Sequence, residues 1–247
     1  MSITGQPGGP PTKSGVPVSD IGCALFAVYG ILSAYIGRTK TGHGQYVDAS
    51  LFEAAIAFSI WDISEYWGTG RVPTPLGTGN RFSAPYQAVK AKDTYFVMGA
   101  NSNKLWQTLC EVIARKDLGA DERFKAIAGR LANRNALIEE LEKTFAQKTA
   151  NEWIDILLGA GIPAGPILNY AETLASEHAK AREAVMEFNH PIEGRVKSIG
   201  FPVKLSETKQ QIRMPPPLLG QHNDEILAEL GIDEKERETM RTDGAFA

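Results

Sequence analysis

The chain has 247 residues, of which 43% are hydrophobic and 22% charged, the balance of an ordinary globular protein with one large or two small domains. Its formal net charge of -3 argues against a general nucleic-acid-binding surface, which requires an excess of Lys and Arg. That charge leaves open a local basic pocket for a phosphorylated cofactor. The two cysteines, Cys23 and Cys110, fall in apolar helical patterns, so we interpret them as small buried hydrophobes in a protein of a reducing compartment.

The longest apolar stretch runs from Ile21 to Ile36 and is interrupted by Gly22 and Gly30. It falls short of the roughly 20 residues that a membrane-spanning helix needs. It also lacks the charged start and the small-residue cleavage site of a signal peptide. We therefore expect a cytoplasmic protein with no membrane partner.

The first 67 residues predict an α/β rhythm of helix, turn, strand and helix. A buried helix is expected from Asp20 to Ile36, capped by Asp20 or Ser19 and ended by Gly37. Residues 45–49 alternate weakly and predict a short strand. Ser50 then begins a helix over residues 51–67, with Glu53 placed as in a capping box.

Residues 68–85 are rich in Gly and Pro and indicate a linker or a functional loop. Beyond it, the apolar spacing predicts a hairpin over residues 86–90 and 95–98, followed by four helical patterns. The remaining predicted elements are an extended piece at 164–167, a helix over 170–183, strand-like pieces within 185–205, and helices at 223–230 and 233–241.

Asp20 stands at the end of a Gly/Pro-rich approach and at the mouth of the apolar helix, where two interpretations compete. The carboxylate caps the helix, which helix termini favour through their free N–H groups and dipole. Alternatively, the carboxylate is held in place for chemistry. Spacing alone favours the cap. The interpretations are compatible, because the same N–H groups would keep the carboxylate ionised, as covalent acyl chemistry requires.

The remaining polar motifs favour neither a metal nor a bound cofactor. The four histidines, His43, His178, His190 and His222, are far apart, and no Cys-x-x-Cys spacing occurs. The sequence has no Gly-x-Ser-x-Gly nucleophile elbow. Gly77-Thr78-Gly79 lacks the third glycine of a dinucleotide fingerprint, and it suits a mobile lid better than a nucleotide loop.

Several separate motifs, in order along essentially the whole chain, resemble the class III CoA-transferases, the CaiB/BaiF family. These motifs are residues 8–12, the Asp20 position, residues 38–48, residues 84–87, residues 161–166, His190-Pro191 with Gly194, and residues 215–222.

The resemblance implies a CaiB/BaiF-type α/β fold with an incomplete Rossmann-like large domain and a small α+β domain. By analogy, residues 1–80 form the large-domain portion with the nucleophile, 81–194 the small domain, and 195–247 a C-terminal return to the large domain. Family members form interlocked homodimers, so a homodimer is expected. They usually carry a long region ahead of Gly8-Gly9-Pro10 that supplies much of the CoA-binding surface. We therefore expect a fragment, a half whose N-terminal partner is encoded separately, or a mis-assigned start.

The resemblance also implies a mechanism, in which Asp20 is the nucleophile. It attacks an acyl-CoA, forms an aspartyl anhydride and then an aspartyl-CoA thioester, and passes CoA to a carboxylic acid. CoA is thus a substrate, and no other cofactor is implied. The loop residues Gly77, Gly79, Asn80 and Arg81 match the place of the family's glycine-containing loop over the substrates. Arg71 and Arg81 flank this loop and either pair with a distal substrate carboxylate or are solvated surface charges.

Two alternatives compete with CoA transfer. Related α-methylacyl-CoA racemases keep an aspartate at the Asp20 position but need a second base. Residues 99–104, where the resemblance would place a Glu, contain no carboxylate. The other alternative is a non-catalytic fragment or partner subunit.

The motifs at 84–87 and 215–222 look most like relatives that use succinyl-CoA and dicarboxylic acids.

Overall fold

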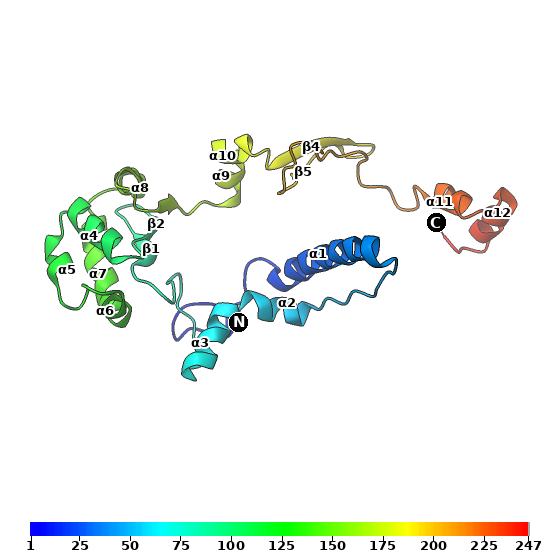
Figure 1. The fold of residues 1–247 in the computed structure, drawn as a ribbon. Coiled ribbons are helices and arrows are strands. Elements are labelled where there is room, and N and C mark those ends of the chain that lie inside the picture. Colours follow the sequence, from blue (N-terminus) through cyan, green and yellow to red (C-terminus); the bar gives the residue numbers. More distant parts are fainter. Residues whose placement is uncertain (247) are drawn as a thin grey trace. The chain divides into compact units, whose positions relative to one another are not determined.

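The structure is a computed structural model that describes residues 1–246, and its chain divides into two compact units, Met1–Ile167 and Leu168–Ala247. Figure 1 shows the elements in chain order. The first unit contains α1 (Val18–Thr41), α2 (Leu51–Phe58), α3 (Ile60–Thr69), β1 (Tyr86–Lys90), β2 (Tyr95–Gly99), α4 (Asn103–Val112), α5 (Lys116–Ala120), α6 (Ile127–Ala132), α7 (Arg134–Phe145), α8 (Ala150–Gly159) and β3 (Ala164–Pro166). The second contains α9 (Tyr170–Ala175), α10 (Glu177–Ala181), β4 (Val185–His190), β5 (Gly194–Ile199), α11 (Asn223–Glu229) and α12 (Glu234–Thr242).

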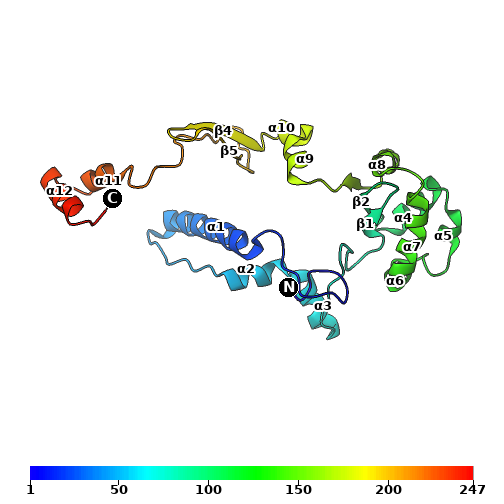
Figure 2. The same cartoon turned by 180° about the vertical axis from the view of Figure 1, so that it is seen from behind.

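The packed core of the first unit comes almost entirely from residues 84–162. The predicted hairpin is confirmed as antiparallel β1 and β2, and β3 adds to the other edge of β2, also antiparallel. Helices α4 to α8 gather about these strands (Figure 2). Phe145 has no exposed surface, and its ring meets those of Phe96 and Trp153 edge-on at 5.3 and 5.2 Å. Such pairs add to the burial of their large apolar area.

The helical patterns between residues 103 and 159 are confirmed, and their caps follow from the sequence. The Ser102 side chain accepts a hydrogen bond from the Leu105 N–H at the start of α4. At the start of α8, Thr149 and Glu152 form a reciprocal capping box. Each cap satisfies amide groups that have no partner within the helix.

Helix α1 is longer than its sequence pattern predicts. It continues through Gly37 and ends at Gly42, whose φ of 79° supplies the left-handed C-cap. Gly37 is therefore a helix residue, and the prediction that it ends the helix was wrong. The helix ends instead at Gly42, in the turn that follows it, where glycine adopts positive φ without strain.

One face of α1 packs against α2 and the segment before it. A side chain at Gly22 would overlap the Phe58 ring, and Phe26 lies 5.7 Å from the same ring. Gly30, one further step of four along the helix, lies against Val47. Positions 22, 26 and 30 thus form a helical stripe of close approach.

Two predictions for residues 45–67 were wrong. Residues 45–49 form no strand, and no described strand lies beside them to accept their ladder hydrogen bonds. The predicted single helix breaks at Ser59 into α2 and α3. Ser50 caps α2 as expected, accepting from the Glu53 N–H at 3.1 Å. The Glu53 carboxylate accepts from the Ser50 hydroxyl rather than from its backbone.

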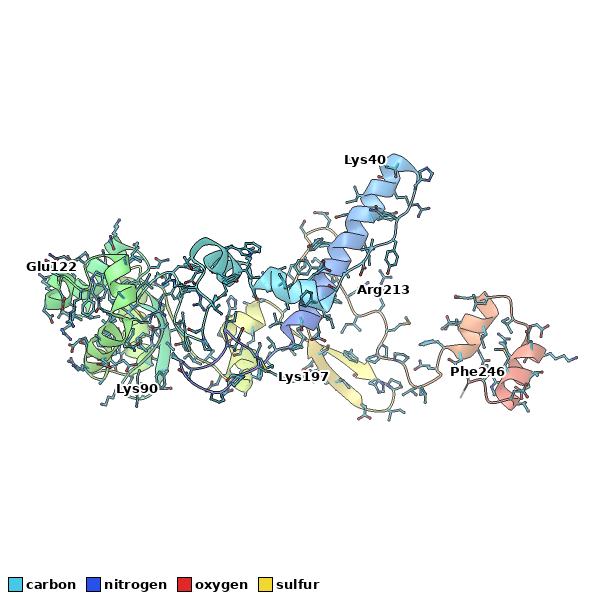
Figure 3. The ribbon with its side chains drawn as sticks, turned by 90° about the horizontal axis from the view of Figure 1, so that it is seen from below. Lys40, Lys90, Glu122, Lys197, Arg213 and Phe246 are labelled. Atoms are coloured by element: carbon cyan, nitrogen blue, oxygen red, sulfur yellow. The ribbon has the colours of Figure 1, made fainter. Side chains whose placement is uncertain are left out.

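The prediction of a buried helix at α1 was wrong, because the rest of α1 to α3 exposes large apolar side chains. In α1 they include Leu25, Leu32 and Tyr35, which are 60%, 56% and 64% exposed. Figure 3 shows side chains standing out from α1 along its length up to Lys40. By length and composition α1 is also the one described helix that could cross a membrane, a test that core helices of soluble proteins pass as well.

The second unit is built from short elements. The predicted helix over residues 170–183 divides at Ser176, where the backbone is extended and the side chain accepts from the Ala179 N–H to cap α10. The predicted strand-like region is confirmed as the β4–β5 hairpin, paired from Val185 with Ile199 to His190 with Gly194. The two C-terminal helices are confirmed as α11 and α12. The division at 80/81 and 194/195 stays a prediction.

Candidate active site

Asp20 lies in the first turn of α1, two residues inside the helix rather than at its cap. Pro17 occupies the N-cap position with φ of -77°, and no side chain caps this end. The prediction of Asp20 or Ser19 as the cap was therefore wrong. The helix begins at Val18, so Ser19 and Asp20 both lie inside its first turn. The Asp20 side chain is exposed, and its recorded hydrogen bond comes from the Ser19 hydroxyl at 3.4 Å.

A first-turn carboxylate keeps part of the advantage that a cap would have. The helix dipole places partial positive charge at this end, which favours a negative side chain. An exposed carboxylate at this end can also be approached by a substrate. The geometry thus suits a nucleophilic carboxylate, although a capping hydrogen bond does not hold it.

The loop at 77–81 is tied down at several points. The Gly77 N–H donates to the Gly5 carbonyl at 2.8 Å, and Gly77 has φ of +61°, which favours glycine. The Asn80 side chain accepts from the amides of Phe82 and Ser83 at 2.8 and 3.1 Å. The N-terminal segment at Gly5 is therefore hydrogen-bonded to this loop, and the loop's role as a mobile lid stays a prediction.

Arg81 is held by acidic residues of α3. Its Nε lies 2.7 Å from Asp62 Oδ1 and 3.5 Å from Glu65 Oε2, and its side chain is 17% exposed. Arg71 lies 3.4 Å from Glu65 but is 76% exposed. The surface-charge interpretation thus fits Arg71 and does not fit Arg81.

The structure brings the predicted loop residues together but leaves Asp20 apart. Gly77, Gly79, Asn80 and Arg81 line one pocket of about 220 Å³. Within residues 1–246, no recorded pocket or hydrogen bond joins Asp20 to this loop. In the described residues, Asp20 and the loop pocket are therefore two separate candidate sites.

Arg134 is the site residue that the sequence analysis missed. It begins α7, and its Nη2 donates to the Asn80 carbonyl. A Cβ at Gly79 would overlap its Nη1, so any side chain there would displace this guanidinium. Its position 54 residues after Asn80 left no local signal in the sequence.

The described residues contain no cluster of three or more His, Cys, Asp or Glu side chains able to hold a metal ion. Residues 99–104 end β2 and lead through the Ser102 cap into α4, with no carboxylate for a racemase's second base.

Sequence comparison matches residues 1–223 to the family described as CoA-transferase family III. The chain is 36% identical over 247 residues to an acyl-CoA transferase of Fusarium pseudograminearum, covering 99% of this chain and 54% of that protein. It is 33% identical over 230 residues to the human succinyl-CoA:glutarate CoA-transferase, covering 93% and 52%. It is 35% identical over 207 residues to the acetyl-CoA:oxalate CoA-transferase of Acetobacter aceti, covering 83% and 52%.

Solved structures agree with this assignment. A CaiB/BaiF family protein from Brucella suis matches with a TM-score of 0.75 and 32% identity over 93% of this chain and 60% of that one. Rv3272 from M. tuberculosis, at 24% identity and a TM-score of 0.77 over 88% and 57%, supports the fold alone. The α/β fold expected from the sequence is confirmed. The chain spans about half the length of the curated relatives it matches.

Proposed function

The chain belongs to CoA-transferase family III, and on this premise we propose that it carries the nucleophile for CoA transfer from an acyl-CoA to a carboxylic acid. The observation that carries the proposal is the family match over residues 1–223, which includes the Asp20 motif at an exposed helix start.

The proposed reaction has two symmetrical halves. A carboxylate oxygen of Asp20 attacks the thioester carbonyl, the C–S bond breaks, and an aspartyl-acyl anhydride and CoA thiolate form. The thiolate attacks the aspartyl carbonyl of the anhydride, which gives an aspartyl-CoA thioester and frees the first acid. The incoming carboxylate attacks that thioester to form a second anhydride and thiolate. The thiolate then takes the new acyl group and releases Asp20 unchanged.

Water exclusion decides whether this sequence transfers CoA or hydrolyses it, because water competes for both intermediates. The loop of Gly77, Gly79, Asn80 and Arg81 is proposed to cover them. Its hydrogen bond to Gly5 supports this role, since it links the loop to the chain that leads into Asp20.

The proposed substrates are a succinyl-type CoA thioester and a dicarboxylic acid. Relatives named for succinyl-CoA with glutarate and with mesaconate support this choice. No cofactor or metal besides the CoA substrate is proposed, and the cytoplasm is the proposed compartment.

Replacement of Asp20 by Asn tests the nucleophile. The complete protein is assayed for transfer from succinyl-CoA to glutarate, with Asp155→Asn, an exposed acidic residue of α8 outside the family motifs, as the matched control. We expect Asp20→Asn to lose activity by at least about 1000-fold, because an amide is a poor nucleophile, and Asp155→Asn to keep it. Full transfer by a non-deamidated Asp20→Asn enzyme would contradict the mechanism.

A second copy or a separately encoded N-terminal polypeptide is the proposed partner. The exposed apolar side chains of α1 to α3 support this proposal, since patches of this extent generally meet another surface. The same feature favours a non-catalytic partner subunit as the second candidate function. Light scattering of the chain alone and with a second polypeptide, combined with the transfer assay, separates a homodimer from a subunit that has no activity by itself.

A further inference from the structure

A pocket of about 940 Å³ beside the glycine-containing loop holds three arginines. Arg71 and Arg81 come from the loop side, and Arg134 comes from the start of α7. Asp62 and Glu65 pair with the first two of these cations. The group therefore keeps one positive charge without a matching carboxylate.

That unmatched charge is Arg134. Within residues 1–246 it forms no ion pair, and its recorded hydrogen bond goes to the neutral Asn80 carbonyl. Its Nη1 is fully buried and has no hydrogen-bond partner. Burial, and then the nearby charge of Arg81, hold the pKa of Arg134 below its usual value.

An anion between the arginines would remove both unfavourable features. A buried donor without a partner destabilises the folded protein, and more so when it is charged. A carboxylate matches the guanidinium fork and forms strong, often paired hydrogen bonds. The pocket is far larger than the roughly 30 Å³ of one water molecule, so it has room for an organic acid.

The end of α7 adds to the attraction but does not carry the argument. Arg134, Asn135 and Ala136, the first turn of this 12-residue helix, are among the residues that line the pocket. Amides in a first turn have no partner within their helix, and the dipole favours negative charge there.

We propose that this pocket binds the distal carboxylate of a dicarboxylic acid, with Arg134 as its main contact. The inference rests on the proposed CoA transfer and names the residue that selects dicarboxylic over monocarboxylic acids. The absence of a side chain at Gly79 fits this role, because a methyl group there would displace the Arg134 guanidinium.

Equilibrium binding tests the proposal without any catalytic turnover. Glutarate and butyrate, acids of similar length with two carboxylates and one, are titrated calorimetrically into the 247-residue chain. We expect glutarate to bind roughly 10-fold more tightly than butyrate, and Arg134→Gln to reduce that ratio to about 2-fold or less. Arg123→Gln, an exposed arginine paired with Asp121 outside this pocket, should leave the ratio unchanged.

Gly79→Ala provides a second variant that keeps Arg134 but moves its guanidinium, and it should also reduce the ratio. Circular dichroism identifies any variant that fails to fold, and the binding ratio of the variant that does fold then tests the proposal. An unchanged ratio in a folded Arg134→Gln or Gly79→Ala chain would overturn the proposal, as would equal binding of both acids by the unchanged chain.

A third ligand separates the two sources of negative charge. Adenosine 3′,5′-bisphosphate represents the phosphates of CoA. If it displaces glutarate and loses affinity in Arg134→Gln, the pocket binds phosphate and the dicarboxylate proposal is wrong. Asp20→Asn should bind glutarate normally, so the two hypotheses fail in different experiments. If Asp20 is not the nucleophile, Asp20→Asn keeps its transfer activity. If Arg134 does not bind the distal carboxylate, Arg134→Gln keeps the glutarate-to-butyrate binding ratio.

Discussion

Two regions of the first unit contain similar amounts of apolar sequence and bury it very differently. Residues 84–162 surround Trp106, Phe96 and Phe145 so completely that none of the three has exposed surface. Helices α1 to α3 bury only Gly22 and Ala54. Apolar periodicity therefore predicts which face of a helix is to be covered, but not which polypeptide covers it.

The largest expected effect comes from truncating the core. Phe145→Ala should lower the free energy of unfolding by about 3–5 kcal/mol, because it removes a fully buried ring between two aromatic partners. Ile31→Ala, at a residue of α1 that is 56% exposed, should change it by less than about 0.5 kcal/mol. Urea unfolding of both variants measures the contrast, and equal losses would erase the distinction between the regions.

A buried arginine gives the next largest effect. Arg130 is fully buried and donates to the carbonyls of Ala84 and Phe124 at 2.7 and 2.9 Å. Arg130→Met should cost roughly 2–3 kcal/mol, because both acceptors lose their partner inside the core. Urea unfolding measures the loss, and a neutral result would show that these acceptors find other donors.

The helix caps give a smaller effect. Thr149→Ala removes a capping box at the start of α8, within the packed core, and should cost about 1 kcal/mol. Ser50→Ala removes the matching cap of α2 in the exposed region. If α1 to α3 unfold separately from the core, Ser50→Ala leaves the main urea transition unchanged. A shared loss would show that the two regions unfold together.

Cysteine reactivity compares the regions without mutation. Burial raises the pKa of the Cys110 thiol to about 12 from 9.0, while Cys23 is only half-buried on α1. Above pH 9 the unfolded chain loses the Cys110 proton and the folded chain keeps it, so the stability from this group declines as pH rises from 9 toward 12. Iodoacetamide at about pH 8.5 should label Cys23 in the folded chain and Cys110 only after unfolding. Mass spectrometry of tryptic peptides checks this, and rapid labelling of Cys110 would contradict its burial.

The core elements could be predicted from the sequence because their signals are local. Apolar spacing, the Thr149 capping box and the alternation around Lys92 each specify their own element. Residues 45–49 show the limit of such signals. Their weak alternation suits a strand, but a strand also needs a neighbour to pair with, and the described chain offers none there.

The site divides in the same way. Asp20 and the 77–81 loop are recognisable from their motifs, yet the helix begins at Val18, which places the cap at Pro17 rather than at Asp20. Arg134 contacts the loop only in the folded structure, through Gly79 and Asn80, so no sequence spacing predicts that it belongs to the site.

In the proposed reaction Asp20 forms a covalent bond with the acyl-CoA substrate, and this bond can be detected directly. The complete protein is mixed with succinyl-CoA, quenched in acid and digested, and the peptide that contains Asp20 is examined by mass spectrometry. We expect a CoA-sized mass increase on this peptide, which is absent in Asp20→Asn and present in Asp155→Asn. An enzyme that transfers CoA between acids while the Asp20 peptide stays unmodified, with the adduct on another residue or on none, would contradict it.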